Sequence, residues 1–162
     1  MPLSRRIRLL GVRVGNLVRA ETLARVRDPD TLRGEIVQMR QRMRAELDRT
    51  DAARFDLKQG EGGLVDLEFL LQWRVLDRAD GDPRWLGPRD TPRLLRLGCE
   101  DGLFDRAGCD ALVGAHAALL EAGLQCTLDR RPRITAETPA IAEARDIIRE
   151  AAVRSGLPFS RE

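Results

Sequence analysis

Apolar and polar residues follow one another along this chain with the period of helices. Asp28-Pro29-Asp30 has the features of a helix start: a capping carboxylate, a proline suited to the first helical position, and an acid near the positive helix end. An apolar stripe at spacings of three and four residues follows it. The stripe consists of Leu32, Ile36, Met39, Met43 and Leu47. The pattern predicts a long helix from residue 28, with Arg33, Arg40 and Arg44 on its other faces.

In the rest of the chain, capping residues, prolines and glycines likewise mark where helices begin and end. Further helices are predicted from Leu64 to Leu76, from Thr91 to near Gly102, from Asp105 to about Leu128, and from Thr138 to about Ala151. The first of these is apolar nearly all round, so we expect it at the centre of the molecule. Trp85 is expected to pin the loop before Thr91 to the core. Cys109 and Cys126 are expected as small core residues.

Together these elements predict an all-α fold, a helical bundle of five or six helices. The count depends on residues 3–26, where two glycines weaken a helical pattern. Runs of β-branched residues are scarce, and no strand is predicted. We divide the chain into an amino-terminal helical segment at 1–27, a helical domain at 28–155, and a frayed tail at 156–162.

Composition narrows the classes of function. The chain has 162 residues, enough for one domain, and a net charge of +2. Three cysteines without a C-x-x-C pair and one histidine, His116, form no zinc pattern, so we expect free thiols, a cytoplasmic protein, and a core or boundary histidine. No apolar run suggests a membrane span or a signal peptide. The basic residues of the first third are expected to form a solvated helical surface, with an acidic or polyphosphate partner as the alternative.

Candidate chemistry gathers around residues 55–73. Lys58 and the pair Gly62-Gly63 precede the central helix, which carries Asp66, Glu68 and Gln72 among apolar neighbours. Burying such polar groups is costly unless each finds a partner. The glycines and the helix start could admit a phosphate, and Lys58 could reach it. The structural alternative is an internal pair between Lys58 and Asp66, with Glu68 and Gln72 bonded to nearby backbone.

This segment resembles the K-x-G-x-G-G-[IL]-x-D-[IL]-E-F-x-x-Q signature of the glutamine synthetase adenylyltransferase/adenylyl-removing family. The matching positions are Phe55, Asp56, Leu57, Lys58, Gly62, Gly63, Asp66, Glu68, Phe69, Gln72, Val75 and Leu76. The Val65-Asp66 pair is similar to the carboxy-terminal, adenylylating half of these enzymes. Weaker matches extend the resemblance over residues 25–128. It implies a helical regulatory region that contacts a nucleotidyltransferase catalytic core, with PII signal protein and glutamine synthetase as partners.

In that family the catalytic core carries a Gly-Ser turn and an Asp-x-Asp pair that hold ATP and Mg²⁺. Such ions neutralise the triphosphate and orient the in-line attack. This sequence lacks that combination, because its one Asp-x-Asp, at Asp28-Pro29-Asp30, follows no Gly-Ser turn and reads as a helix start. We therefore expect no catalytic or metal-binding residue, no cofactor bound by this chain alone, and no AMP transfer by it. Arg40, Arg44 and Lys58 are the basic candidates for contacting phosphate or the core.

Other classes of function stay open at this stage. One alternative is a free-standing helical protein–protein interaction module. A second is the helical domain of a PII uridylyltransferase, which has a similar Lys-Gly-Gly loop. A nucleic-acid binder using the basic region from Arg5 to Arg54 is less favoured, because that region lacks stacking aromatics and a recognised motif.

Overall fold

The computed structural model describes residues 23–160, and its helices confirm the all-α prediction. Five α-helices lie fully within this range: α2 (Pro29–Leu47), α3 (Leu64–Arg78), α4 (Thr91–Glu100), α5 (Arg106–Leu128) and α6 (Pro139–Arg154). A 3-10 helix, η1 (Pro83–Leu86), lies between α3 and α4. The residues of the predicted amino-terminal segment before Leu23 lie outside the described range.

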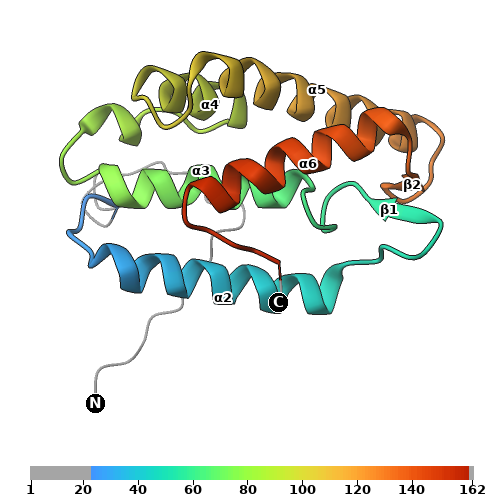
Figure 1. The fold of residues 1–162 in the computed structure, drawn as a ribbon, viewed down its shortest axis with the longest axis horizontal. Helices are drawn as coiled ribbons and strands as arrows, with labels where there is room; N and C mark the ends of the chain where they lie inside the picture. Colours follow the sequence, from blue (N-terminus) through green and yellow to red (C-terminus); the bar gives the residue numbers. More distant parts are fainter. Residues whose placement is uncertain (1–22, 161–162) are drawn as a thin grey trace.

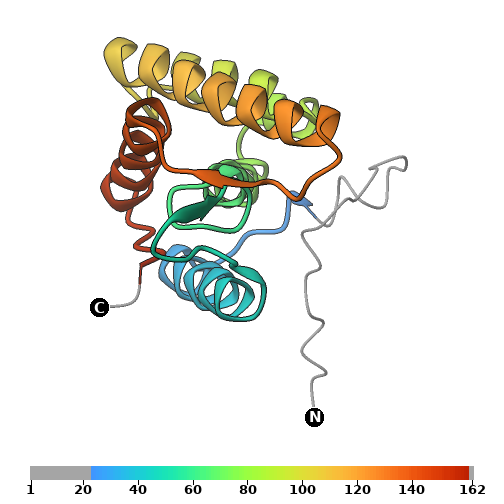
Figure 2. The ribbon, with the colours of Figure 1, turned by 90° about the vertical axis from the view of Figure 1, so that its right-hand side faces the viewer.

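Helix α3 occupies the centre of the bundle, as its apolar composition predicted. In Figure 1 it runs between α2 on one side and the pair α4 and α5 on the other, with α6 crossing in front. Figure 2 looks nearly along α3 and shows it enclosed by α2, α6 and the upper helices. Leu67, Leu70 and Leu71 are completely buried there. The central helix thus joins the other helices into one hydrophobic core.

The predicted capping residues stand at the helix starts. Asp28, Asp105 and Thr138 each accept a hydrogen bond from a backbone N–H in the first turn of the helix that follows. Helix α4 is capped by Asp90, one residue before the predicted Thr91. Trp85, in η1, is 1% exposed, which confirms that it pins its loop to the core.

The prediction of no strand was wrong. Strands β1 (Arg54–Asp56) and β2 (Ile134–Ala136) pair antiparallel, with Phe55 opposite Thr135. Each strand has three residues, too few to show an alternating pattern, and their pairing joins parts of the chain that are distant in sequence. The ribbon closes the end of the bundle at which the glycine-rich segment begins (Figure 1).

The tail after α6 is not frayed over its described part. Leu157 and Phe159 are buried, and the Phe69 and Phe159 rings meet edge to face. The Phe159 carbonyl accepts a hydrogen bond from Arg44 of α2 at 2.8 Å. The sequence prediction failed because it treated a short apolar ending as free, whereas both side chains join the hydrophobic core.

The prediction of three free thiols was wrong for two of them. Cys99 at the end of α4 and Cys109 at the start of α5 form a disulfide. Cys126 is free and buried, as expected for a small core residue. The two bonded cysteines are brought together by the turn between α4 and α5, and their spacing alone matches no familiar motif.

Helix α5 is the one described helix long and apolar enough, by length and composition, to cross a membrane. Only 28% of its apolar window is buried in the bundle. The core helix of a soluble protein passes the same test, so this finding is weak evidence for a membrane span. It does identify α5 as an apolar helix with a large uncovered face.

Candidate functional site

The glycine-rich segment before α3 folds back on the first turn of that helix. The backbone N–H groups of Leu64 and Val65 donate to the carbonyls of Leu57 and Lys58 at 3.0 and 3.1 Å. The first free amides of a helix are the groups that bind anions at helix starts. Because these amides already have partners within the chain, the phosphate site expected at this helix start is not formed.

The two signature glycines are required by close backbone contacts. Gly62 has φ +77°, and a Cβ there would lie 2.3 Å from the Arg145 carbonyl oxygen of α6. At Gly63 a Cβ would lie 2.8 Å from the Gly60 carbonyl oxygen. No side chain fits either gap without moving backbone. The glycines therefore allow the loop to pack against α6 and against itself.

Asp66 is the acceptor at the centre of a buried polar cluster, which we call the Asp66 cluster: Arg40, Arg44, Gln59, Gly62 and Asp66. Its carboxylate accepts hydrogen bonds from Arg40 Nε at 2.6 Å, from a terminal nitrogen of Arg44 at 2.6 Å, and from the Gly62 N–H at 2.7 Å. Asp66 is 2% exposed. The cluster ties α2, the loop and α3 together through charge-assisted hydrogen bonds.

Arg40, a predicted contact for phosphate or the core, is buried within the bundle and is not available to phosphate. Its side chain is 0% exposed, and it also donates to the Gln59 carbonyl at 2.7 Å. Burial lowers the pKa of the Arg40 guanidinium, and the Asp66 charge opposes this shift. The buried apolar stripe of α2 is also shorter than predicted, because Leu32 and Ile36 are buried whereas Leu47 is exposed.

Arg44, the other α2 candidate, is also occupied within the chain. Its two terminal nitrogens bind Asp66 and the Phe159 carbonyl. Asp66 pairs with Arg40 and Arg44, both in the last two turns of α2, and not with Lys58 as predicted. The sequence signal that could have shown this is the i, i+4 spacing of Arg40 and Arg44, which places both on one face.

The remaining signature side chains point outward. Lys58 and Glu68 are exposed and Gln72 is half-buried, so the prediction of three buried polar groups on α3 holds for Asp66 alone. Among the described residues, none of these three side chains has a hydrogen bond or ion pair, and the bonds to backbone expected of Glu68 and Gln72 are not formed. Desolvation by the surrounding protein raises the pKa of the Glu68 carboxyl, while the charges of Lys58 and Arg40 oppose this shift.

No catalytic constellation appears around these groups. Within residues 23–160, no three His, Cys, Asp or Glu side chains are placed to hold a metal ion. Asp28 caps α2, and Asp30 pairs with Arg33 on the surface. Both carboxylates of the one Asp-x-Asp are thus engaged within the chain. His116 is half-buried on α5, a boundary position, and burial lowers its pKa.

Comparison with known proteins finds relatives in several bacteria that share one name. The chain is 54% identical over 143 residues to the bifunctional glutamine synthetase adenylyltransferase/adenylyl-removing enzyme of Stenotrophomonas maltophilia strain K279a, a match that covers 88% of this chain and 15% of the relative. The enzyme of the same name from Xanthomonas axonopodis pv. citri is 54% identical over 142 residues, with the same coverages. That from Nitrosococcus oceani is 42% identical over 101 residues, 62% of this chain and 10% of the relative. No protein-family model matches the chain.

Proposed function

We propose that this chain, a homologue of one region of the bifunctional glutamine synthetase adenylyltransferase/adenylyl-removing enzymes, is the non-catalytic, regulatory helical part of such a nucleotidyltransferase. The chain spans about 15% of the length of the curated relatives it matches. The Val65-Asp66 pair favours the carboxy-terminal, adenylylating half as the corresponding region. The proposed setting is nitrogen control in the cytoplasm.

The division of the signature into two sets of residues carries this proposal. Gly62, Gly63 and Asp66 are used within the bundle, where they fix the loop to α3. The side chains of Lys58, Glu68 and Gln72 form no hydrogen bond or ion pair with any other described residue, and we call them the outward signature face. A fold needs the first set for its own packing. The side chains of the second set form no such contacts within the described residues. We therefore propose that they contact a neighbouring domain.

The chemistry of the outward signature face suits a polar domain contact. It combines one ammonium, one carboxylate and one amide, which can donate and accept several hydrogen bonds. The neighbour proposed is the nucleotidyltransferase core that binds ATP and Mg²⁺. In the assembled enzyme this face would brace that core, and effectors such as PII signal protein and glutamine would act through the helical part. Glutamine synthetase is the proposed protein substrate of the assembled enzyme.

A mass assay tests the non-catalytic part of the proposal. The purified chain is mixed with glutamine synthetase, ATP and Mg²⁺, and the intact mass of glutamine synthetase is measured. We expect no added AMP, because the described residues contain no site for the metal ions that the transfer needs. The full-length Stenotrophomonas relative serves as the positive control. Clear adenylylation by the chain alone would contradict the proposal.

Calorimetry separates the regulatory proposal from an unrelated interaction module. Binding of PII protein or glutamine to the chain, or to the chain together with the remainder of the relative, is expected for a regulatory part. Absence of binding in both forms would favour the free-standing module instead.

A further inference from the structure

One covalent bond closes the corner between α4 and α5. Cys99, in the last turn of α4, is bonded to Cys109, in the first turn of α5, and their Cα atoms are 5.9 Å apart. Disulfides are rare in cytosolic proteins, and those that occur there are usually transient and serve catalysis or redox sensing. In the cytoplasmic setting proposed above, this bond therefore calls for a role other than permanent cross-linking.

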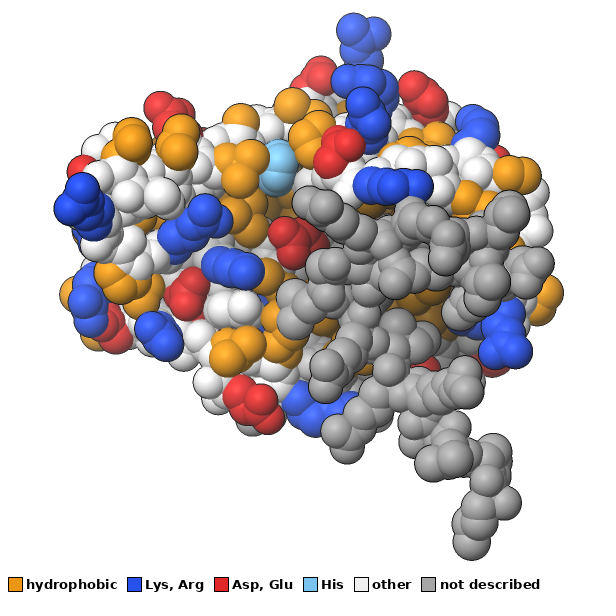
Figure 3. Space-filling view, turned by 180° about the vertical axis from the view of Figure 1, so that it is seen from behind, with side chains coloured by type: hydrophobic (Ala, Val, Ile, Leu, Met, Phe, Trp, Pro, Cys, Tyr) orange, Lys and Arg blue, Asp and Glu red, His pale blue; other side chains and the backbone are white. Residues whose placement is uncertain are grey.

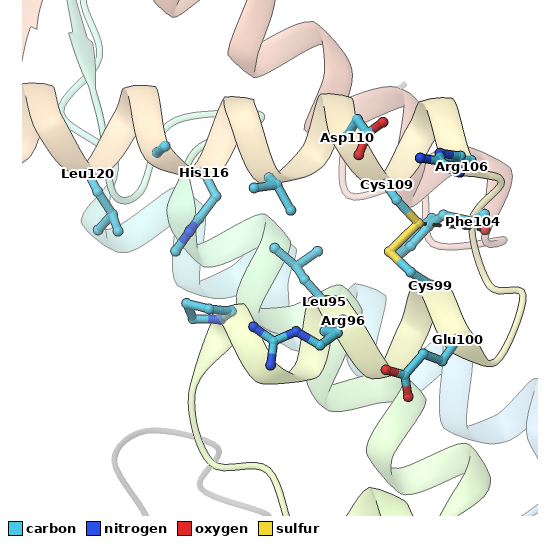
Figure 4. A pocket seen from close by; sticks show the side chains of 13 residues that line it. Leu95, Arg96, Cys99, Glu100, Phe104, Arg106, Cys109, Asp110, His116 and Leu120 are labelled. Atoms are coloured by element: carbon cyan, nitrogen blue, oxygen red, sulfur yellow. Dashed lines mark hydrogen bonds between the residues drawn. A yellow bond between two sulfur atoms is a disulfide. The ribbon is translucent and has the colours of Figure 1, made fainter.

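The bond lies in the wall of a groove that solvent can enter. The groove has a volume of about 710 Å³, lies between α4 and α5, and is lined by both cysteines and by Phe104. Figure 4 shows the two sulfur atoms bridging the helices beside Phe104. The single histidine, which lines the same groove, reaches the surface among hydrophobic side chains (Figure 3). Cys99 is half-buried whereas Cys109 is 8% exposed, so a small thiol entering the groove meets Cys99 first.

The corner has hydrogen bonds of its own that do not involve the disulfide. At the end of α4, the Leu103 N–H donates to the Gly98 carbonyl at 2.9 Å. Gly102, between them, has φ +70°, the left-handed conformation that favours glycine at a helix end. At the start of α5, the Asp105 side chain accepts from the Gly108 N–H at 2.7 Å. These bonds remain when the disulfide is broken, so we expect the reduced chain to keep both helices.

We propose that Cys99 and Cys109 form a reversible redox site, which dithiol reductants open and small disulfides close. In the opening direction, a thiolate of the dithiol attacks the Cys99 sulfur, a mixed disulfide forms, and the Cys109 sulfur leaves as a thiolate. The second thiolate of the reductant then attacks the reductant's first sulfur and releases Cys99. Two electrons pass to the cysteine pair, the two protons of the dithiol end on the cysteines, and the reductant becomes a disulfide. Closing is the same exchange in reverse, with a small disulfide reduced to its thiols.

Reduction would change how tightly the two helix ends are held together. The Phe104 carbonyl oxygen lies 3.7 Å from the Cys109 sulfur, so a Cys109 thiol has an acceptor to which it can donate. Without the covalent link, the last turn of α4 and the first turn of α5 can move separately, and both form walls of the groove. Leu112 and Leu119, farther along α5, are buried in the core and anchor the rest of the helix. The loosening is therefore expected to stay at the corner and to alter the groove.

The third cysteine provides an internal reference. Cys126 is free and 0% exposed, because it lies in the hydrophobic core. Thiol chemistry follows access to the sulfur atom, so Cys126 should not react in the folded chain. The fold thus places two of its three cysteines at a groove and keeps the third away from solvent.

Thiol counting on the full chain tests the proposal. The chain is equilibrated without denaturant in buffers with different ratios of reduced to oxidised dithiothreitol, trapped with acid, unfolded, labelled with a maleimide and weighed by mass spectrometry. We expect one label on the oxidised chain, from Cys126, and three on the reduced chain, with both new thiols appearing at a single midpoint. Cys126→Ala should show the same midpoint, with no label and two labels. Circular dichroism should show the same helix content in both states.

Hydrogen exchange locates the effect. After short labelling times, at which the amides of α3 stay protected in both states, the amides of residues 99–109 should exchange roughly tenfold faster in the reduced chain. Cys99→Ser, which cannot form the bond, should exchange like the reduced chain with or without dithiothreitol. These readouts do not depend on AMP transfer, so their failure would leave the proposed function untouched.

Four results would overturn the proposal. A chain that keeps three thiols in oxidising buffer forms no bond at this site. A bond that opens only in urea is a permanent cross-link, and a reduced chain that loses its helices requires the bond in order to fold. Equal exchange of residues 99–109 in the two states would show that the bond does not control the corner.

Discussion

Helices α3 and α5 are both rich in apolar residues, yet α3 is mostly buried and α5 is mostly exposed. Helix α3 carries several charged residues and is buried along most of its length, Asp66 included. Helix α5 has a far longer apolar run and leaves Val113, Leu124 and Leu128 in solvent. The comparison shows that the burial of a side chain in this molecule depends on the elements packed against its helix. Asp66 is buried because two arginines bind it, and these α5 side chains are exposed because no described element covers them.

The largest expected effect comes from removing the acceptor of the Asp66 cluster. Asp66→Ala would leave Arg40 charged and fully buried without a counter-ion. Breaking one partner of a buried pair costs about 3–5 kcal/mol. We expect a loss of this size in the free energy of unfolding, measured by urea denaturation. Glu68→Ala, on the exposed side of the same helix, should change it by less than about 0.5 kcal/mol. Equal effects of the two substitutions would show that the cluster does not stabilise the fold.

A pair of leucine substitutions sharpens the comparison of α3 with α5. Leu70→Ala in α3 removes a side chain that is 0% exposed and should cost about 2–5 kcal/mol of unfolding free energy. Leu124→Ala in α5 should cost less than about 0.5 kcal/mol, because Leu124 is 59% exposed. A comparable loss at Leu124 would mean that this side chain is covered within one chain.

The smallest effect concerns the charge of Glu68. Its pKa is raised in the folded chain, chiefly by desolvation, so the folded state holds the proton more tightly than the unfolded state. The sign follows from linkage: stability is highest below the unfolded pKa and falls as pH rises through the folded pKa. Glu68→Gln should remove this part of the pH dependence, which urea denaturation across the acidic range would detect. A carbon NMR titration that gives Glu68 a lowered pKa would contradict the prediction.

The sequence predicted the parts of the fold that local chemistry determines. Capping by Asp28, Asp105 and Thr138 and the central place of α3 were all predictable, because each depends on residues adjacent in the chain. The ribbon of β1 and β2 and the disulfide were missed, because each depends on contacts between separate elements.

The site was predicted as a set of residues but not as an arrangement. The signature correctly marked Asp66 as needing a partner, yet it could not show whether Lys58 or an arginine of α2 would supply it. Charged residues on a helix usually face solvent, which is why Arg40 was expected to contact phosphate or the catalytic core. The buried position of Arg40 follows only from the docking of α2 on α3, which no local pattern records.

The most direct test of the account concerns the outward signature face. In the full-length Stenotrophomonas enzyme, the homologous region is replaced by this chain, and the rate of AMP transfer to glutamine synthetase is measured by mass. Glu68→Gln should lower that rate about tenfold or more, as expected when a charged hydrogen bond at a domain contact is lost. Glu143→Gln, the same change at an exposed position of α6, should leave the rate unchanged. Equal rates for the two variants would contradict the claim that this face serves a neighbouring catalytic domain.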